Sequence, residues 1–169
     1  MSTVATRITP EELLHMPDEG VRYELVDGEL RERNVSKESS AVGAAFVAHL
    51  YIWCGSGNRG WVYGSDLGFR CFENSHTVRF PDASFVSLAR MPLETYEDEG
   101  YCGTVPDLVV EVVSPNDLAS EVESKCLDWL AAGVRTVWIA YPNTKSLHVY
   151  RNDGSTAAYK VGDTLADAS

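Results

Sequence analysis

The sequence has no apolar run that approaches the length of a membrane span. Its first residues, MSTVATRITPEELL, lack the apolar core of a secretory signal, so we expect a cytoplasmic protein without a membrane partner. It also lacks a CxxC pair, and its four histidines are scattered without the spacing of metal ligands. The four cysteines are therefore expected to be reduced and structural.

Basic residues are scarce. The chain carries 14 Lys and Arg against 25 Asp and Glu, for a net charge of −11. This balance argues against tight non-specific binding to nucleic acid or to an anionic membrane, because such binding normally rests on a basic surface. A nucleic-acid role would need a local basic groove, or a divalent cation that neutralises the acids.

What is present is ordinary for a globular protein. The 169 residues, 44% of them hydrophobic, suit one domain over 1–169 with a real core. Helices and strands alternate irregularly along the chain, which predicts an α/β or α+β sheet domain. We expect helices from residue 9, at 39–53 and at 117–132, a hairpin at 23–33, strands at 61–65, 67–72, 77–86, 107–113, 134–141, 146–151 and 156–160, and a long loop at 87–104.

Two acids interrupt the apolar strand VPDLVVEVVSP. Asp107 and Glu111 point to the same face, because side chains on a strand alternate. Four residues at about 3.3 Å each nevertheless separate them by roughly 13 Å. That distance is too large for both to hold one metal ion, whose ligands lie at about 2.0–2.5 Å. If Glu111 binds a metal, its partner must come from elsewhere.

Asp82, in RFPDASFV, is the best candidate for that partner. If the strands at 79–86 and 107–113 are neighbours, Asp82 and Glu111 face each other with about 5 Å between backbones. Two carboxylates at this spacing repel each other unless a cation lies between them. Magnesium suits such a site, because it takes one or two carboxylates, several waters and a substrate phosphate.

Lys125 is the third candidate. On a helical wheel, five residues form an apolar stripe that faces the sheet: Leu118, Val122, Cys126, Trp129 and Leu130. Lys125 lies at the edge of this stripe, where its ammonium group either snorkels to solvent or reaches an acid beneath the helix. Glu111 precedes this helix on the adjoining strand and is within reach.

Each candidate also has an ordinary interpretation. Asp107 follows Pro106 and can simply open the strand or cap a turn, and Asp82 follows Pro81 and can serve turn chemistry. Lys125 can pair with Glu121 four residues earlier on an exposed helix face. These interpretations do not explain why Glu111 lies among valines, because an unpaired buried carboxylate is costly.

Several motifs together resemble the Uma-type (Uma-two) restriction endonuclease family of the PD-(D/E)XK nuclease superfamily. In chain order they read YELVDGEL, GSDLGFR, VRFPDASFV, PDLVVEVVSPND, the downstream Lys125, LAAGVRTVWIAYP and LHVYR. The resemblance covers roughly residues 10–165. It implies a mixed central sheet flanked by helices, with an N-terminal hairpin and C-terminal strands, and a magnesium-dependent endonuclease acting on DNA.

The resemblance also assigns roles. Asp82 matches the acid of the PD motif and Glu111 the acid of the (D/E)XK motif, while Glu24 and Asp107 match further acidic positions. The superfamily lysine is absent two residues after the acid, where Val113 stands, and Lys125 resembles a relocated lysine.

The implied mechanism is a Mg²⁺ ion, or Mn²⁺ in its place, held by Asp82, Glu111 and the Val112 backbone carbonyl. Lys125 orients the attacking water or stabilises the phosphate, and Tyr23 and Arg70 are weaker candidates for contacts to the nucleic-acid backbone.

Two alternatives stay open. The net charge of −11 and the displaced lysine also fit a nuclease-fold protein that binds or assembles without cleaving. The acidic residues Glu94, Glu97, Asp98 and Glu99 fit a hydrolase of a small phosphodiester, or simply a solvated loop. A homodimer is possible on either interpretation.

Overall fold

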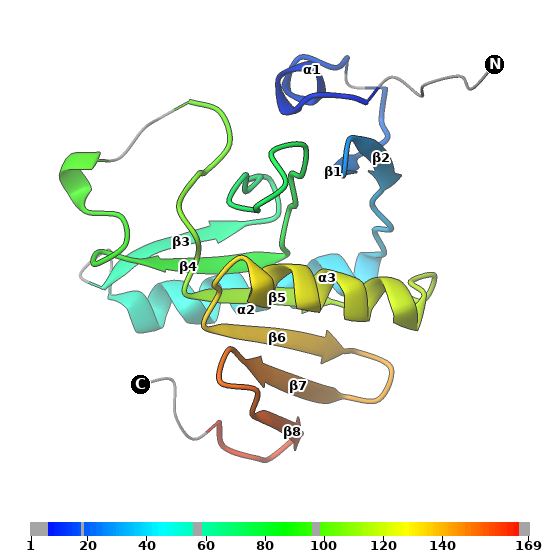
Figure 1. Cartoon of the computed structure of the whole chain (residues 1–169). Helices are drawn as coiled ribbons and strands as arrows, with labels where there is room; N and C mark the ends of the chain where they lie inside the picture. The colour runs from blue at the N-terminus through cyan, green and yellow to red at the C-terminus, as the bar shows by residue number, and fades with distance from the viewer. Residues whose placement is uncertain (1–6, 18, 56–58, 96–98, 166–169) are drawn as a thin grey trace.

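The computed structural model describes residues 7–17, 19–55, 59–95 and 99–165. These residues build a two-stranded hairpin and a six-stranded sheet with two long helices (Figure 1). In chain order the elements are α1 (Pro10–Leu14), β1 (Tyr23–Val26), β2 (Glu29–Glu32), α2 (Lys37–Cys54), β3 (Gly60–Gly64), β4 (Ala83–Ser87), a 3₁₀ turn (Leu93–Thr95), β5 (Leu108–Val112), α3 (Ala119–Ala131), β6 (Thr136–Tyr141), β7 (Ser146–Arg151) and β8 (Thr156–Lys160).

The short-range signals place the first elements. Thr9 caps α1 in a capping box with Glu12, and Pro10 occupies the first turn, where a missing N–H costs nothing. Asp27 and Gly28 both take positive φ (54° and 82°), the backbone of a tight turn that suits the twist of β1 and β2. Ser36 caps α2, so this helix begins two residues earlier than the apolar pattern indicates.

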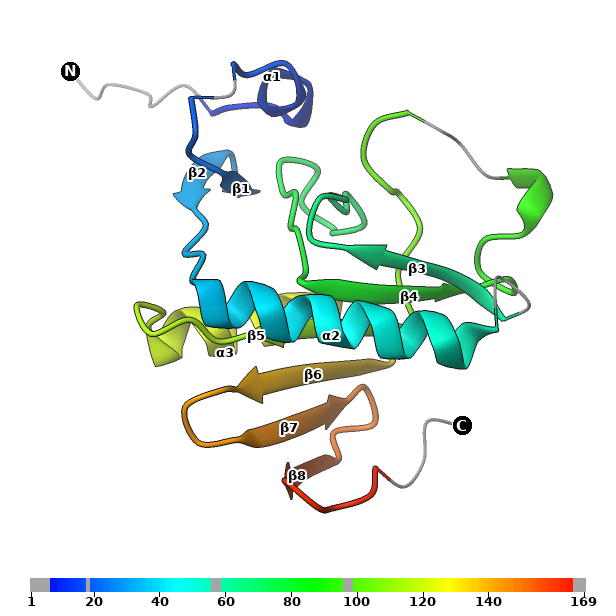
Figure 2. The same cartoon turned by 180° about the vertical axis from the view of Figure 1, so that it is seen from behind.

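The large sheet has the order β3-β4-β5-β6-β7-β8, with β5 and β6 parallel and every other pair antiparallel. The helix α3 connects the two parallel strands and covers one face of the sheet, whereas α2 crosses the opposite face over β3, β4 and β5 (Figures 1 and 2). This is the mixed sheet with flanking helices that the family resemblance implies.

Alternation along the strands gives each face its own core. Val109, Val137 and Ile139 pack with Trp129 and Cys126 of α3. On the other face, Leu50 of α2 packs in a core with Ala83, Val110, Val112 and Ala140 of the sheet. Because strand side chains alternate, Glu111 is directed to the α3 face while Val110 and Val112 are directed to α2.

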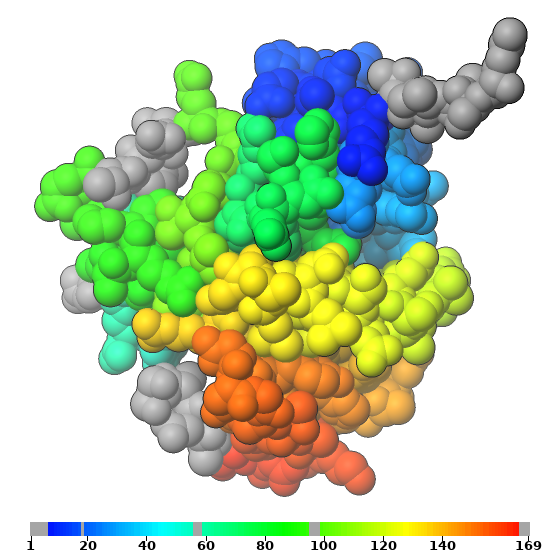
Figure 3. Space-filling model, viewed as in Figure 1, coloured from blue at the N-terminus to red at the C-terminus, as the bar shows by residue number. Residues whose placement is uncertain are grey.

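Two expected strands are largely wrong. The segment 67–72 pairs only through bridges at Phe69, to Arg79 and to Cys102, and the run 77–86 becomes a strand only from Ala83. Pro81 supplies no N–H for a ladder, which explains why the regular strand begins after it. The segment before Pro81 instead joins the hairpin, through the bridge between Leu25 and Val78. The N-terminal residues 7–33 and the segment 67–80 lie side by side above α3 (Figure 3).

The stripe of α3 is also narrower than expected. Cys126 and Trp129 are buried, but Leu118 is exposed and precedes the first helical turn. All four cysteines are free, as expected. No helix among the described residues combines the length and apolar character that a membrane crossing requires.

Candidate active site

Asp82 directly precedes β4, and Glu111 lies on β5, the neighbouring strand that the sequence predicts. Strands β4 and β5 are antiparallel, with Ala83 opposite Val110. Continuing this register by one residue sets Asp82 opposite Glu111. The Val112 N–H donates a hydrogen bond to Asp82 Oδ2 (2.7 Å), which fixes the aspartate against the end of β5.

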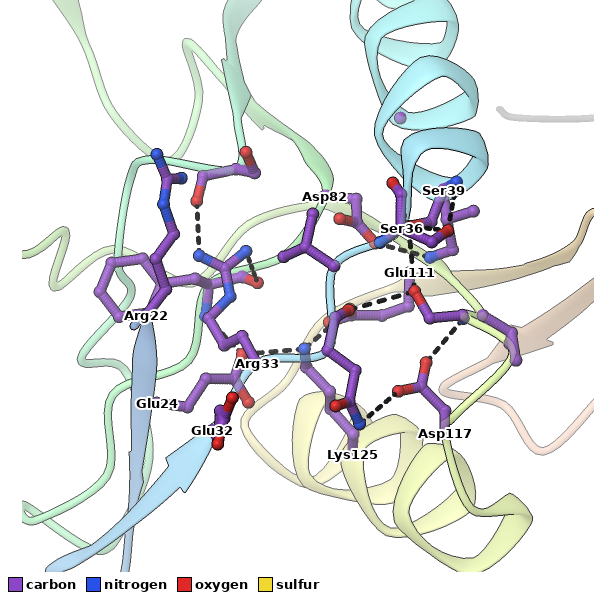
Figure 4. A pocket seen from close by; sticks show the side chains of 18 of the residues that line it. Arg22, Glu24, Glu32, Arg33, Ser36, Ser39, Asp82, Glu111, Asp117 and Lys125 are labelled. Atoms are coloured by element: carbon purple, nitrogen blue, oxygen red, sulfur yellow. Dashed lines mark hydrogen bonds and ion pairs between the residues drawn. The ribbon is translucent and has the colours of Figure 1, made fainter. Parts of the chain in front are cut away.

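Lys125 points toward Glu111. Its ammonium group forms ion pairs of 2.8 Å with Glu111 Oε2 and with Glu24 Oε1, and its side chain is only 20% exposed. Figure 4 shows the lysine rising from α3 to lie between the two acids. Among the described residues it forms no ion pair with Glu121, so the ordinary interpretation of Lys125 is wrong.

Glu24 enters the site from the hairpin. Its Oε1 also accepts a hydrogen bond from the Phe80 N–H (2.9 Å), and its Oε2 accepts one from Arg79 (3.1 Å). Arg79 is itself buried and pairs with Asp128 of α3. The arginine therefore connects the hairpin acid to the helix that carries Lys125.

Trp129, which the sequence places on the apolar stripe of α3, also belongs to the site. Its indole N–H donates to Glu111 Oε1 (2.8 Å), so Lys125 and Trp129, one helical turn apart, each hold one oxygen of the same carboxylate. Neither Trp129 nor Arg79 was predicted from the sequence as a site residue. The available signals were the place of Trp129 on the apolar stripe of α3 and a lone cation in the apolar run TVRF.

The charges divide the acids into two kinds. Burial favours a raised pKa for Glu24, but Lys125 and Arg79 outweigh it, so the pKa of Glu24 falls below its ordinary value. Burial raises the pKa of Glu111 to about 7; Lys125 opposes this shift, whereas the charges of Asp82 and Glu24 add to it. Burial likewise raises the pKa of Asp82. Glu24 therefore stays ionised. Asp82 and Glu111 have too little positive charge around them to offset the effect of burial on their pKa.

Lys125 remains a cation. Burial alone would lower its pKa, but the charges of Glu111 and Glu24 outweigh that effect and raise it. The lysine can act as a fixed positive charge and hydrogen-bond donor, not as a proton acceptor near neutral pH.

Asp107 lies at the other end of β5, as its spacing from Glu111 predicts. Its Oδ1 pairs with Arg90 (3.0 Å) and Arg135 (3.4 Å), and its Oδ2 accepts from the Ser87 N–H (2.8 Å). It therefore does not join Glu111, and the proposal of Asp107 as an additional acid of the site is withdrawn.

The weaker candidates also fall outside the site. Arg70 pairs with Glu11 (2.5 Å) beyond the groove, and Tyr23 does not line it. Of the acidic loop residues, Glu94 and Glu99 are exposed, whereas Glu97 and Asp98 lie outside the described residues.

One groove of about 1500 Å³ contains the four central groups of the site, which are Glu24, Asp82, Glu111 and Lys125. The hairpin and the segment leading to α2 form one wall, and the N-terminal turns of α2 and α3 form the others. Figure 4 shows Ser36 and Ser39 on the α2 side, and Arg22, Glu24 and Arg33 on the hairpin side.

The charges at the site favour a divalent cation. Glu24, Asp82, Glu111 and Asp128 carry four negative charges when ionised, and Arg79 and Lys125 carry two positive charges, which leaves an excess of two. No group of three or more His, Cys, Asp or Glu side chains in the described part of the chain is arranged to hold a metal. Asp82 and Glu111 are two carboxylates, the number that Mg²⁺ commonly takes from a protein.

The Val112 carbonyl is a third oxygen of the right kind. The N–H and C=O of one strand residue point to the same side, and the Val112 N–H points to Asp82. The residue opposite Val112 in the continued register is Pro81, which has no N–H to donate. Two carboxylates and a carbonyl thus fit the ion by charge and by donor chemistry.

Comparison with known proteins concerns the fold and the family. A solved structure, titled as a putative nuclease belonging to DUF820 from Anabaena variabilis ATCC 29413, superimposes with a TM-score of 0.77 at 22% identity, over 96% of this chain and 89% of the other. This likeness shows the fold. The search of curated proteins found no match. The family model of Uma2, described as a putative restriction endonuclease, matches residues 10–167, and this supports a nuclease-type function. The chain therefore belongs to the Uma2 family.

Proposed function

We propose that the protein is a Mg²⁺-dependent endonuclease that hydrolyses phosphodiester bonds of DNA. The observation that carries this proposal is the pair of half-buried Asp82 and buried Glu111, both with raised pKa, beside a lysine that stays charged. A buried excess of negative charge at the wall of a groove is what a divalent cation stabilises.

Asp82, Glu111 and the Val112 carbonyl would hold the ion. When bound, it supplies Lewis-acid charge that polarises the scissile phosphate and makes a water a better nucleophile. Asp82 is fixed for this role by the Val112 N–H, and Glu111 by the Trp129 indole. Both carboxylates are therefore oriented before a substrate arrives, which reduces the reorganisation that the reaction requires.

Lys125 would act on the phosphate. An ammonium group has three N–H donors, and Glu24 and Glu111 take two of them. The third donor can bind the attacking water or a phosphate oxygen that gains charge in the transition state. Glu24 and Arg79 hold Lys125 in place and keep it charged, so Glu24 serves as a supporting acid.

The test uses dialysed protein with Mg²⁺ or Mn²⁺ on single-stranded, double-stranded and branched DNA. We expect cleavage by the wild type, and losses of at least about a hundredfold in Asp82→Asn and Lys125→Met, the scale on which charge-stabilising groups act. A protein that binds these DNAs without cutting them is a binding module. Cleavage of bis(4-nitrophenyl) phosphate but of no DNA would indicate a small phosphodiester as substrate.

A further inference from the structure

Arg33 is a cation held in a fixed position on the wall of the groove. It follows β2, and its guanidinium donates to the backbone carbonyls of Ser65 (3.1 Å) and Phe80 (3.4 Å). The same group stacks on the Phe80 ring, 5.2 Å from its centroid. Two carbonyls and a ring therefore orient a half-buried charge without neutralising it.

The other cations that line the groove all have carboxylate partners. Arg22 pairs with Asp66 and Arg31 with Glu29, while Arg79 and Lys125 belong to the buried network. Arg33 forms no ion pair in the described parts of the chain, although its charge acts on Asp82. Its remaining N–H donors are left for a group that the protein itself does not supply.

We infer that Arg33 is the phosphate clamp of this site, and that it holds a phosphodiester oxygen of a nucleic-acid strand over Asp82 and Glu111. Guanidinium suits this task because it is always charged and its planar N–H groups match phosphate oxygens in pairs. The inference rests on the proposed function, and it names the residue that binds substrate rather than the groups that perform the chemistry.

The clamp also accounts for how so acidic a protein admits a polyanion. The groove holds an excess of negative charge at half-buried Asp82 and buried Glu111, and this charge repels phosphate. A cation without an internal partner, oriented on the same groove, offsets that repulsion at one phosphate. Arg22, by contrast, is paired with Asp66 and must first lose that partner.

The test measures binding separately from cleavage. A short fluorescein-labelled oligothymidylate is titrated with wild-type protein by fluorescence anisotropy in Ca²⁺, an oxygen-preferring cation, at several salt concentrations. Gels run on the same samples verify that the probe stays intact. The variants are Arg33→Met, which keeps the apolar stem, and Arg33→Lys, which keeps the charge. Arg151→Met on β7, outside the groove, controls for the loss of one positive charge.

Arg33→Met should weaken binding about tenfold. It should also reduce the slope of log K against log salt by about 0.7, the contribution of one phosphate contact on a single strand. Arg33→Lys should lose less affinity and keep the slope, because a point charge remains. Arg151→Met should stay within about twofold of the wild type.

A merely structural Arg33 would behave differently. Loss of its hydrogen bonds to Ser65 and Phe80 would lower the melting temperature. The slope of log K against log salt would stay unchanged. As a second readout, the rise of melting temperature in Mn²⁺ should be kept or enlarged in Arg33→Met, because a nearby cation opposes metal binding.

The two proposals fail in different ways. If Arg33→Met binds the oligonucleotide as Arg151→Met does, or if the wild type does not bind it, the clamp is refuted even where bis(4-nitrophenyl) phosphate is cleaved in Mn²⁺. If binding depends on Arg33 as expected but no substrate is cleaved with Mg²⁺ or Mn²⁺, the clamp stands and the endonuclease proposal falls.

Discussion

At the scale of single residues, the site is defined by which charges are compensated. Glu24 has two cations and a backbone N–H, whereas Glu111 shares one cation and faces two other acids. Asp82 and Glu111 form the pair whose charges are poorly compensated. Removing one of these two acids should therefore change stability in the opposite direction from removing Glu24, whose charge is compensated.

Asp82→Asn tests this idea. Asparagine keeps an oxygen to accept the Val112 N–H, while one repelling charge is lost. Without metal, we expect the variant to melt at the wild-type temperature or above. With millimolar Mn²⁺ the wild type should gain stability by mass action, and the variant should lose most of that gain.

Lys125→Ala is the counterpart to that variant. It should keep a metal-induced rise of the melting temperature, because a cation beside the ion opposes its binding, but it should lose cleavage. Thermal melts of the three proteins, with and without Mn²⁺, check both expectations. An undiminished shift in Asp82→Asn would remove Asp82 from the metal site.

The raised pKa of Glu111 predicts a pH dependence for the metal-free protein. The folded state binds the Glu111 proton more tightly than the unfolded state does, with a pKa of about 7 against an ordinary 4.5. The contribution to stability is full below pH 4.5 and is lost as pH rises through 7. The difference between these two pKa values corresponds to about 3 kcal/mol. Urea unfolding in EDTA at a series of pH values measures it.

Glu111→Gln is the control for this measurement. The variant cannot titrate at this position, so the decline of unfolding free energy between pH 4.5 and 7 should flatten. An unchanged decline would assign the titration to another group.

At the scale of elements, α2 comes close to the site at Gly43. A Cβ at this position would lie 3.4 Å from Asp82 Cβ, an ordinary contact, and Gly43 does not have positive φ. The helix is thus tightly but not forbiddingly packed against the aspartate.

Two substitutions at Gly43 should separate stability from metal binding. Gly43→Ala should stabilise the protein by about 0.5–1 kcal/mol, because alanine favours the helix interior. Gly43→Val adds branched methyls against Asp82 and should reduce the Mn²⁺-induced rise of the melting temperature. Chemical denaturation and thermal melts measure the two effects. An unaltered Mn²⁺ response in Gly43→Val would mean that α2 does not position Asp82.

At the scale of the whole molecule, the net charge of −11 opposes any polyanion. We therefore expect no stable complex with duplex DNA in EDTA, and a complex once millimolar Mn²⁺ or Ca²⁺ neutralises the buried acids. Mobility-shift assays in each condition test this expectation. Equal affinity with and without a divalent cation would show that DNA binds outside the groove described above.

Short-range patterns determined most of the framework. The turn at Asp27 and Gly28, the cap of α1 and the strands from β5 to β8 depend on neighbouring residues, and all were predictable. The prediction of strands failed at 67–80, because an apolar alternating run can form either a continuous β-ladder or isolated bridges. Only the position of the hairpin decides between them.

For the site, the sequence by itself determined that Asp107 and Glu111 lie too far apart to share an ion, since the spacing along one strand is local geometry. The meeting of Asp82 and Glu111 required β4 and β5 to be neighbours, which the tertiary structure decided. Only the tertiary structure decided the partners of Lys125 and the roles of Arg79, Trp129 and Arg33. Arg79 and Glu24, for example, are 55 residues apart. Such contacts form where the hairpin docks above α3, and burial there selects one partner for each charge in a way that no residue spacing records.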